Sequence, residues 1–421
     1  MVLRSWRKKL LPYINWGIAV SCFLVQLTIQ VSSGMLASQL SQEFSLDAVS
    51  VAVLMGMVFY PNICFQIPAG IVTDRFGARK VLSVGAVVCS IGAYGFSHAD
   101  SFFSACVFRL IMGSGLSFAF VSMAYLIANW MRKDDFSKMF CIAEMIALSF
   151  TVGVMRYLAV ALQEISWRLF IQGICYAAMV LAVLAFVCIR DRPDYLEDQQ
   201  PFISLGDLLV QLKGFLKDHM MWANGIYSGL LFSCLSCFVA QWGPNFLSNA
   251  TTMSFEDAAG MCTFITMGLV VACPLLSLAI PKVVHIRSVM SLSALVTSIL
   301  LSLVVMFPMM DLFMMRCCLF LTGFFSAAYL IPFTIAHYYV RPGSKSTSIG
   351  FTNMLSTIFG PLLSLLIAWL IDFQHDADLL SSYSLYDYQY GLNILPMSMF
   401  FAAMAAFFVP IAHRPGLERD L

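Results

Sequence analysis

The sequence AGIVTDRFGARKVL, at residues 69–82, places charged residues and glycines between two long apolar runs. An aspartate at the end of one helix can accept hydrogen bonds from the free backbone N–H groups that begin another helix. Arginines can pair with carboxylates or with the carbonyls that end a helix, and glycines permit tight turns and close helix approach. The stretch therefore predicts a gating contact between helices, formed by Gly70, Asp74, Arg75, Gly77 and Arg79. A loop that is merely basic would not need an aspartate between two glycines.

Four ionisable residues stand inside apolar runs: Arg109, Glu144, Arg156 and Arg316. A guanidinium binds a carboxylate or a phosphate through two parallel hydrogen bonds, so Arg156 is a candidate substrate ligand. Glu144 is a candidate carrier of a proton. The alternatives are that the arginines extend to a membrane interface, that Arg156 forms a pair between helices, and that Glu144 forms a salt bridge with Lys138 or with the adjoining loop.

Uncharged polar residues also interrupt the apolar runs. Gln26 and Gln30 are four residues apart, which places them on one face of a helix. The candidate substrate-binding residues are Gln26, Gln30, Arg109, Arg156, Tyr227, Gln241, Tyr329 and Asn353. Each uncharged member can instead form a hydrogen bond between neighbouring helices.

The elements that carry these residues are expected to be membrane-spanning helices. The 421-residue chain is 60% hydrophobic, has a mean hydropathy of +0.84 and is only 11% charged. Twelve apolar stretches are long enough to cross a bilayer as helices, near residues 13–36, 50–69, 81–97, 102–128, 139–162, 168–189, 220–247, 258–280, 286–308, 312–338, 346–371 and 391–411. Lipid cannot satisfy backbone N–H and C=O groups, so the sequence predicts an all-α membrane protein with twelve transmembrane helices.

The basic residues fall on one side of this arrangement. If the N-terminus is cytoplasmic, clusters such as those at residues 4–9, 75–80, 132–138 and 190–192 all lie inside, whereas the opposite loops are mainly acidic. The positive-inside rule then predicts that both termini are cytoplasmic. We expect a bacterial inner membrane, with the lipid bilayer, a small-molecule substrate and protons as partners of a monomer.

The chain is predicted to divide into two six-helix bundles. The division is residues 1–190 for the first bundle, 191–219 for a polar cytoplasmic linker, and 220–421 for the second bundle. An offset of 207 residues takes Arg75 to Lys282 and Arg109 to Arg316, which suggests an internal repeat. Two like-oriented halves with this pseudo-symmetry are typical of transporters whose substrate site lies between them.

Residues 70–80, GIVTDRFGARK, resemble the signature of the major facilitator superfamily, although Ala78 stands where a basic residue is common. Arg109 with Gly113 and Gly115 resembles the fourth-helix motif of the same family, and WGP at residues 242–244 resembles the end of its seventh helix. Residues 108–130 are most similar to members from intracellular bacteria that take up small nutrients. The resemblance implies that Asp74 meets the eleventh helix, that Arg109 takes part in proton coupling or substrate binding, and that helices one, four, seven and ten line the cavity.

The expected function is alternating-access transport of a small polar or anionic metabolite, with proton-coupled uptake. Export of a metabolite, siderophore or drug on the same fold is one alternative, and a receptor that binds ligand without moving it is another. The sequence indicates no enzyme, because it contains no zinc-ligand cluster, phosphate-binding glycine loop or Ser/His/Asp set. We expect no cofactor, no metal and, without a basic surface, no nucleic-acid partner.

Overall fold

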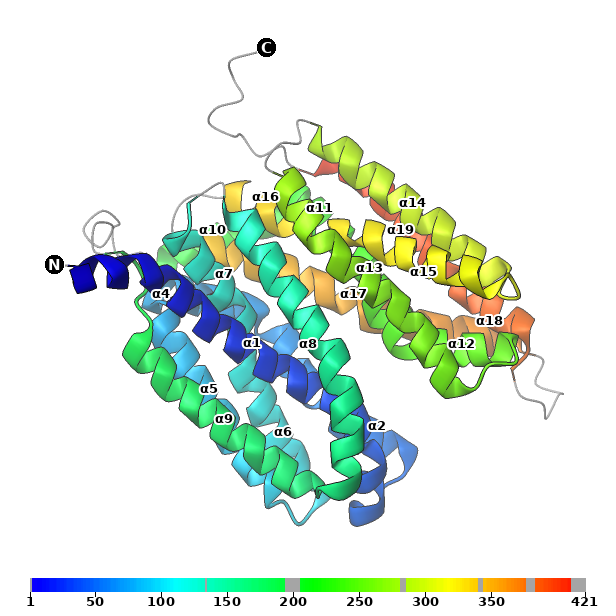
Figure 1. Ribbon diagram of the computed structural model, residues 1–421, viewed down its shortest axis with the longest axis horizontal. Coiled ribbons are helices and arrows are strands. Elements are labelled where there is room, and N and C mark those ends of the chain that lie inside the picture. Colours follow the sequence, from blue (N-terminus) through cyan, green and yellow to red (C-terminus); the bar gives the residue numbers. More distant parts are fainter. Residues whose placement is uncertain are drawn as a thin grey trace. The chain divides into compact units, whose positions relative to one another are not determined.

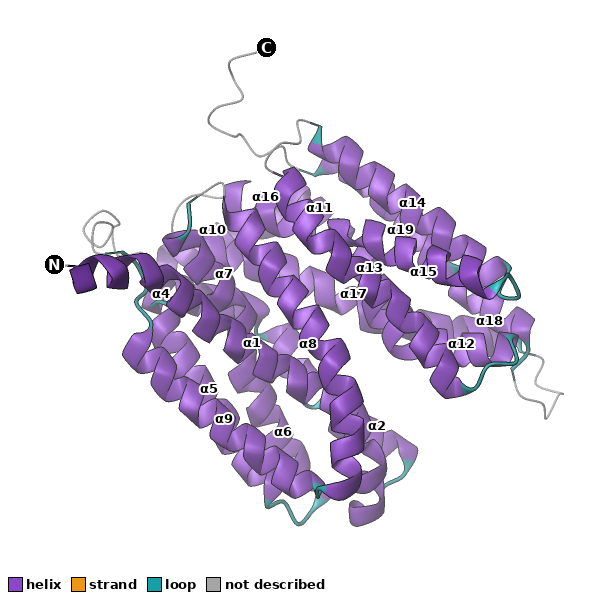
Figure 2. Ribbon diagram, in the orientation of Figure 1, coloured by secondary structure: helices purple, strands orange, loops and turns teal. Residues whose placement is uncertain are grey.

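The computed structural model describes residues 2–132, 135–193, 205–280, 285–339, 344–375 and 383–409. These residues form helices joined by short turns, and they contain no strand (Figure 2). Among the described residues, eleven helices are long and apolar enough to cross a membrane, and a twelfth span is formed if one bent helix pair is counted as a single crossing. The prediction of an all-α protein with twelve spans is therefore confirmed.

Contacts between residues divide the chain into two units. Unit 1 comprises Met1–Lys213 and Val340–Phe351, and unit 2 comprises Gly214–Tyr339 and Thr352–Leu421. In this division residues 340–351 group with the N-terminal unit, and the boundary after the sixth span falls inside a short helix. Whether residues 1–190 and 220–421 behave as two bundles stays a prediction.

Unit 1 contains the first six spans (Figure 1). Its helices are α1 (Val2–Phe44), α2 (Ala48–Gly56), α3 (Phe59–Cys64), α4 (Gln66–Phe76), α5 (Ala78–Ser97), α6 (Phe102–Leu116), α7 (Ala119–Trp130), α8 (Phe136–Glu164) and α9 (Trp167–Cys188), followed by most of α10 (Leu205–Lys217). The second span is broken at Phe65, where α4 bends by 50° from the preceding helix. Pro68 lies in the first turn of α4 and has no N–H to donate to the carbonyl of Cys64, which favours the break.

Unit 2 contains the remaining spans. Its helices are α11 (His219–Ser233), the π-helix η3 (Cys234–Trp242), α12 (Gly243–Ala250), α13 (Phe255–Ala279), α14 (Ile286–Met306), α15 (Leu312–Ser326), the 3₁₀-helix η5 (Ala327–Leu330), α16 (Ile331–Tyr339), α17 (Lys345–Gln374), α18 (Leu385–Leu392), α19 (Ile394–Ala405) and η6 (Ala406–Phe408). The first turns of α17 belong to unit 1. Spans seven and ten are thus interrupted by non-α turns rather than continuous.

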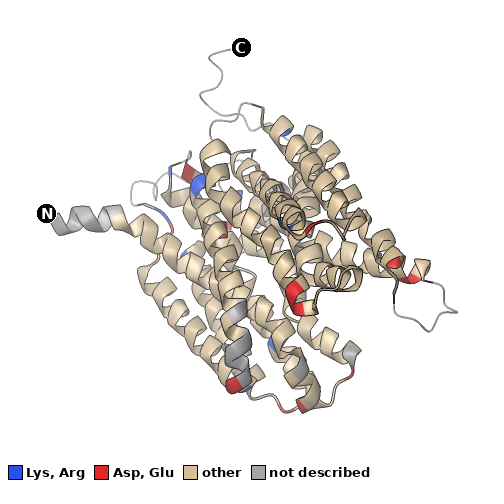
Figure 3. Ribbon diagram, turned by 45° about the vertical axis from the view of Figure 1, so that its right-hand side comes forward, with Lys and Arg blue, Asp and Glu red and all other residues tan. Residues whose placement is uncertain are grey.

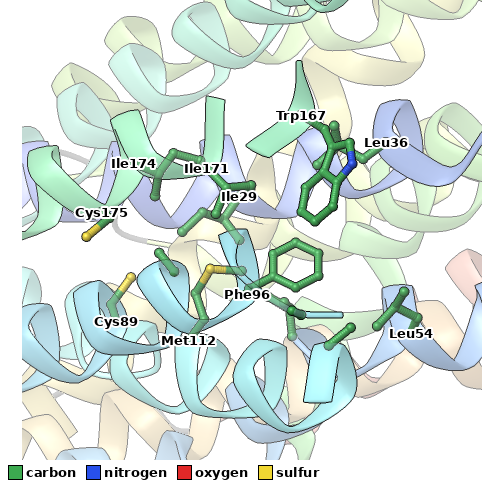
Figure 4. Close-up of a cluster of buried hydrophobic side chains, with 14 of the residues drawn as sticks. Ile29, Leu36, Leu54, Cys89, Phe96, Met112, Trp167, Ile171, Ile174 and Cys175 are labelled. Atoms are coloured by element: carbon green, nitrogen blue, oxygen red, sulfur yellow. The ribbon is translucent and has the colours of Figure 1, made fainter. Parts of the chain in front are cut away.

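The core of unit 1 is apolar and lies among α1, α5, α6 and α9 (Figure 4). Ile29, Phe96, Met112 and Trp167 are each almost fully buried there, and the rings of Phe96 and Trp167 are 5.1 Å apart between centroids. Because lipid removes the hydrophobic drive between helices, this close packing holds the bundle together.

The exposed faces of the helices, which point away from the core, are also apolar. On α9, Val183 and Phe186 are more than half exposed, and on α17 the same is true of Leu365 and Trp369. Charged residues are sparse along the described helices (Figure 3). Such surfaces suit contact with lipid tails rather than water.

Candidate functional site

The carboxylate of Asp74 binds the first turn of α17. Its Oδ1 accepts the backbone N–H of Ser346 at 3.1 Å, and its Oδ2 accepts both the backbone N–H and the hydroxyl of Thr347 at 2.8 Å each. Only 8% of Asp74 is exposed. The negative carboxylate therefore satisfies N–H groups that a helix N-terminus leaves free, at the positive end of the helix dipole. We call this arrangement the α4–α17 contact.

Two glycines permit the close approach of these helices. A Cβ at Gly70 would lie 2.5 Å from Cα of Thr347 and 2.6 Å from the carbonyl oxygen of Ser346. A Cβ at Gly350 would overlap the carbonyl oxygen of Gln66. Because Gln66, Gly70 and Asp74 recur every four residues, one face of α4 lies along the first turns of α17.

The turn after α4 is held by a residue that the sequence reasoning missed. Gly77 has φ +82°, a conformation that favours glycine, and a Cβ there would overlap the carboxylate of Asp191. That carboxylate accepts the backbone N–H of Arg79 at 2.8 Å, so it caps the start of α5. Burial raises the pKa of the Asp191 carboxyl, although Arg79 and Arg192 act in the opposite direction.

The two arginines of the motif have different surroundings. The Nε of Arg79 donates to the carbonyl oxygen of Phe186 at 2.6 Å, and its guanidinium lies 4.8 Å from the centre of the Phe186 ring. Arg79 thus binds the last turn of α9, as expected of a cation near a helix C-terminus. The guanidinium of Arg75 lies over the ring of its neighbour Phe76, at 5.1 Å. A gating role for either arginine stays a prediction.

Arg109 is buried in unit 1, with 1% of its surface exposed. Its Nη2 donates to the hydroxyl of Ser33 at 2.6 Å and is 3.5 Å from the carbonyl oxygen of Met55, while the guanidinium lies 5.1 Å from the centre of the Phe96 ring. Within the described part of the chain, these partners are a hydroxyl, a carbonyl and a ring, and none is a carboxylate. Arg109 therefore links α6 to α1 and α2 instead of extending to the surface.

The other ionisable residues of the spans are distributed differently. Glu144 is buried in α8, with 6% exposed. Arg156 lies on α8 as well, but its side chain is outside the described part of the structure. Arg316 is exposed on α15, and its guanidinium lies 5.8 Å from the centre of the Phe264 ring.

Three amides meet at the bend of the second span. The Nε2 of Gln26 donates to Oδ1 of Asn62 at 3.1 Å, and the Nε2 of Gln66 donates to the same oxygen at 3.0 Å. Gln30 is half-buried on α1. The sequence reasoning selected Gln26 and Gln30 but missed Asn62 and Gln66, whose signal was two amides spaced four residues apart in an apolar run.

In unit 2, Tyr227 and Tyr329 are both buried. The hydroxyl of Tyr227 donates to the carbonyl oxygen of Met290 at 2.8 Å. Ser228 joins α11 to η5 by donating to the carbonyl oxygen of Tyr329 at 2.9 Å. These bonds fasten helices to one another, and a substrate-binding role for either tyrosine stays a prediction.

Gln241 and Asn353 lie elsewhere in unit 2. Gln241 is exposed at the end of the π-helix, where its Oε1 accepts the hydroxyl of Ser364. The same Ser364 oxygen accepts the indole N–H of Trp242 at 2.9 Å. Asn353 is 9% exposed on α17. Because the candidate residues are distributed over both units, their convergence on one site stays a prediction.

A family model described as Major Facilitator Superfamily matches residues 18–364. The chain belongs to the major facilitator superfamily. Among solved structures, this superfamily member is similar to the proton:xylose symporter XylE, with a TM-score of 0.68, 14% identity, and coverage of 95% of this chain and 96% of that one. It is also similar to FucP in the outward conformation, with a TM-score of 0.69, 13% identity, and coverage of 95% and 100%.

Curated relatives of this superfamily member match over shorter stretches. The hexuronate transporter of Bacillus subtilis (strain 168) is 22% identical over 229 residues, or 52% of each chain. The 4-hydroxybenzoate transporter PcaK of Acinetobacter baylyi (strain ATCC 33305 / BD413 / ADP1) is 25% identical over 119 residues, or 28% of this chain and 26% of that one. An uncharacterized transporter of Buchnera aphidicola subsp. Schizaphis graminum (strain Sg) is 33% identical over 105 residues, or 25% and 26%. The matches thus span a quarter to a half of these relatives. The chain is therefore a multi-pass membrane protein of the major facilitator superfamily.

Proposed function

We propose that the protein is a secondary active transporter that takes up a small polar or anionic metabolite together with protons, by alternating access. The observation that carries this proposal is the binding of Asp74 to the first turn of α17. In this proposal the α4–α17 contact closes one side of the protein and breaks when that side opens.

The energetics of the contact suit a reversible gate. A hydrogen bond to a charged group contributes about 1.5–3 kcal/mol, and Asp74 accepts three of them. The bonds end on a single carboxylate, so a modest movement of α17 breaks them together. Water then forms hydrogen bonds with the separated carboxylate and N–H groups. The free energies of the open and closed states can therefore differ by only a few kcal/mol.

The orientation in this proposal places the α4–α17 contact on the cytoplasmic side. Its support is the distribution of basic residues, which cluster in the loops on the same side as both termini. The membrane in the proposal is a bacterial inner membrane, and the transporter acts as a monomer.

The proposed substrate is a hydroxylated carboxylate. Two of the curated relatives are named for hexuronate and for 4-hydroxybenzoate, each of which carries at least one hydroxyl group and a carboxylate. Arg156 is the proposed partner of the carboxylate, because a guanidinium binds it with two hydrogen bonds. Gln30, Gln241 and Asn353 are the proposed ligands of other polar atoms.

Glu144 is the proposed proton carrier. It is a buried carboxyl group on a membrane-spanning helix, a position at which ionisable groups commonly serve proton transfer. This proposal gives Arg109 no direct part in proton transfer, because its guanidinium contacts the hydroxyl of Ser33, the carbonyl oxygen of Met55 and the ring of Phe96, none of which is an acid near neutral pH.

The test is uptake by the purified protein reconstituted in proteoliposomes. Labelled D-glucuronate and 4-hydroxybenzoate are each supplied outside, with the external solution more acidic than the lumen, equal to it, or more alkaline. Proton-coupled uptake predicts accumulation above the external concentration only with the acidic exterior. Protein-dependent movement that never exceeds equilibrium would contradict coupling, and accumulation driven by an acidic lumen would instead indicate exchange and export.

A further inference from the structure

The bend between α3 and α4 contains a buried cluster of three amides. Gln26, Asn62 and Gln66 are 3%, 7% and 0% exposed, respectively. They come from α1, α3 and the first residue of α4. Neutral amides are costly to bury unless both their donors and their acceptors are satisfied.

The hydrogen bonds within the cluster leave two acceptor oxygens without a donor. Oδ1 of Asn62 accepts from both glutamines, so each glutamine uses an N–H group there. The Oε1 atoms of Gln26 and Gln66 are buried and have no hydrogen-bond partner among the described residues. The cluster therefore presents two carbonyl-type oxygens and needs donors to complete it.

We propose that Gln26, Asn62 and Gln66 form a subsite that binds hydroxyl groups of the transported solute. Two amide oxygens accept O–H hydrogens and repel carboxylate oxygens, which have only lone pairs to offer. A neutral hydroxyl suits this site better than an ammonium, because the cluster supplies no negative charge to offset a buried cation. The subsite rests on the proposed transport function and adds recognition of hydroxyl groups to it.

The position of Gln66 connects the subsite to the α4–α17 contact. Gln66, Gly70 and Asp74 lie on one face of α4, at intervals of four residues. That face packs against Gly350, Thr347 and Ser346 of α17. A solute that draws Gln66 toward its hydroxyl thus acts on the helix that carries Asp74, two turns away.

The experiment uses matched ligands and matched variants of the full-length protein in detergent. The first ligand pair is D-glucuronate against tetrahydropyran-2-carboxylate, which has the same ring and carboxylate but lacks the hydroxyls. The second pair is 4-hydroxybenzoate against benzoate. Gln26→Met and Gln66→Met each remove an amide while keeping side-chain length. Gln172→Met is the control, because Gln172 is a half-buried amide on α9, outside the cluster.

Ligand binding is measured as the rise in melting temperature with ligand concentration. We expect the hydroxylated member of at least one pair to stabilise the wild-type protein at concentrations about tenfold lower than its partner, as loss of one hydrogen bond implies. In Gln26→Met and Gln66→Met the two members should become equal, whereas Gln172→Met should retain the wild-type preference. Because each glutamine is changed separately, failure of one variant to fold leaves the other as the test.

Any of four results would overturn the subsite. The first is equal stabilisation by both members of each pair, the second is no stabilisation by either hydroxylated ligand, and the third is a preference that persists in both methionine variants. A preference for the ligands without hydroxyls would also overturn it, and would mean that the glutamines turn their NH₂ groups toward a carboxylate. Uptake measured on the same proteins separates the two proposals: hydroxyl-dependent binding without flux contradicts transport alone, and flux without hydroxyl dependence contradicts the subsite alone.

Discussion

Thr347 donates two hydrogen bonds to the same oxygen of Asp74, one from its backbone N–H and one from its hydroxyl, and each is 2.8 Å long. The backbone bond is available to any residue at this position except proline. The hydroxyl bond is specific to threonine or serine, so the side chain strengthens a contact that the helix N-terminus already provides.

Thr347→Val should weaken the α4–α17 contact without abolishing it. Valine keeps the shape of threonine but lacks the hydroxyl, and one hydrogen bond to a carboxylate contributes about 1.5–3 kcal/mol, or at least tenfold in the closed-to-open ratio. The backbone N–H groups of Ser346 and Thr347 should exchange with deuterium about tenfold faster, as measured by mass spectrometry of peptides from the start of α17. Thr357→Val is the control, because among the described residues its hydroxyl bonds to carbonyls of α17 itself. Equal exchange in wild type and Thr347→Val would mean that the hydroxyl adds nothing to closure.

Gly70→Ala should separate α4 from α17. The added methyl group would lie 2.5 Å from Cα of Thr347, in contact with backbone that cannot rotate away. Overpacking of this kind costs about 1–3 kcal/mol, which outweighs the gain of about 0.5–1 kcal/mol from replacing glycine within a helix. We expect a lower melting temperature and faster exchange at the start of α17.

The matched control for that substitution is Gly173→Ala on α9. A Cβ there meets nothing within 4 Å, so the variant should melt at the wild-type temperature or above it. If both alanine variants behave alike, the close approach at Gly70 is not needed for the α4–α17 contact.

Asp191 should make the free energy of unfolding depend on pH, with its stabilising contribution larger at low pH. Burial raises the pKa of its carboxyl in the folded protein above the ordinary 3.8, so the folded state binds a proton more tightly than the unfolded state does. The contribution of this group is therefore greatest below its ordinary pKa, and it is lost as pH rises through the raised value.

Asp191→Asn removes this titration while keeping an oxygen that can accept from Arg79. At pH 7.5 the variant should melt at a higher temperature than the wild type, and the difference should shrink as pH falls toward 4. Melting curves of the two proteins over that pH range test the prediction. A difference that does not change with pH would show that Asp191 is not the titrating group.

Glu144→Gln should uncouple uptake from the proton gradient. In the proposed function the carboxyl carries the proton, and glutamine cannot. The ratio of uptake with and without an acidic exterior should fall to about one. Arg109→Met should lower the rate of uptake and the melting temperature, because it breaks the links to Ser33 and Met55, but it should keep the wild-type ratio. If instead Arg109→Met alone removed the gradient dependence, the assignment of Glu144 would be wrong.

The number and type of the spans could be predicted because hydropathy reports directly on lipid exposure. The breaks within them could not, since an apolar run gives no sign of where its backbone hydrogen bonds fail. The bend at Phe65 lies in a run predicted to be continuous, and so does the π-helix Cys234–Trp242. Pro68 was the available signal for the first of these.

The α4–α17 contact was predicted in outline, because an aspartate between two glycines has few other uses at the end of a span. Its helix partner came from the family resemblance alone. The hydroxyl of Thr347, the cap by Asp191 and the Asn62 amide depend on residues that are distant in the sequence and become neighbours only through folding. A pattern within one helix cannot indicate such contacts.

The most direct test of the central claim is the initial rate of proton-driven uptake by Asp74→Asn in proteoliposomes. The amide offers one oxygen in place of two and turns an NH₂ group toward the donors of Ser346 and Thr347, so the closed state should lose most of its stabilisation. We expect uptake at least about tenfold slower than wild type, with fold retained as judged by the melting temperature and faster exchange at the start of α17. Wild-type uptake in a variant that has lost protection at Ser346 and Thr347 would show that the α4–α17 contact is not part of the transport cycle.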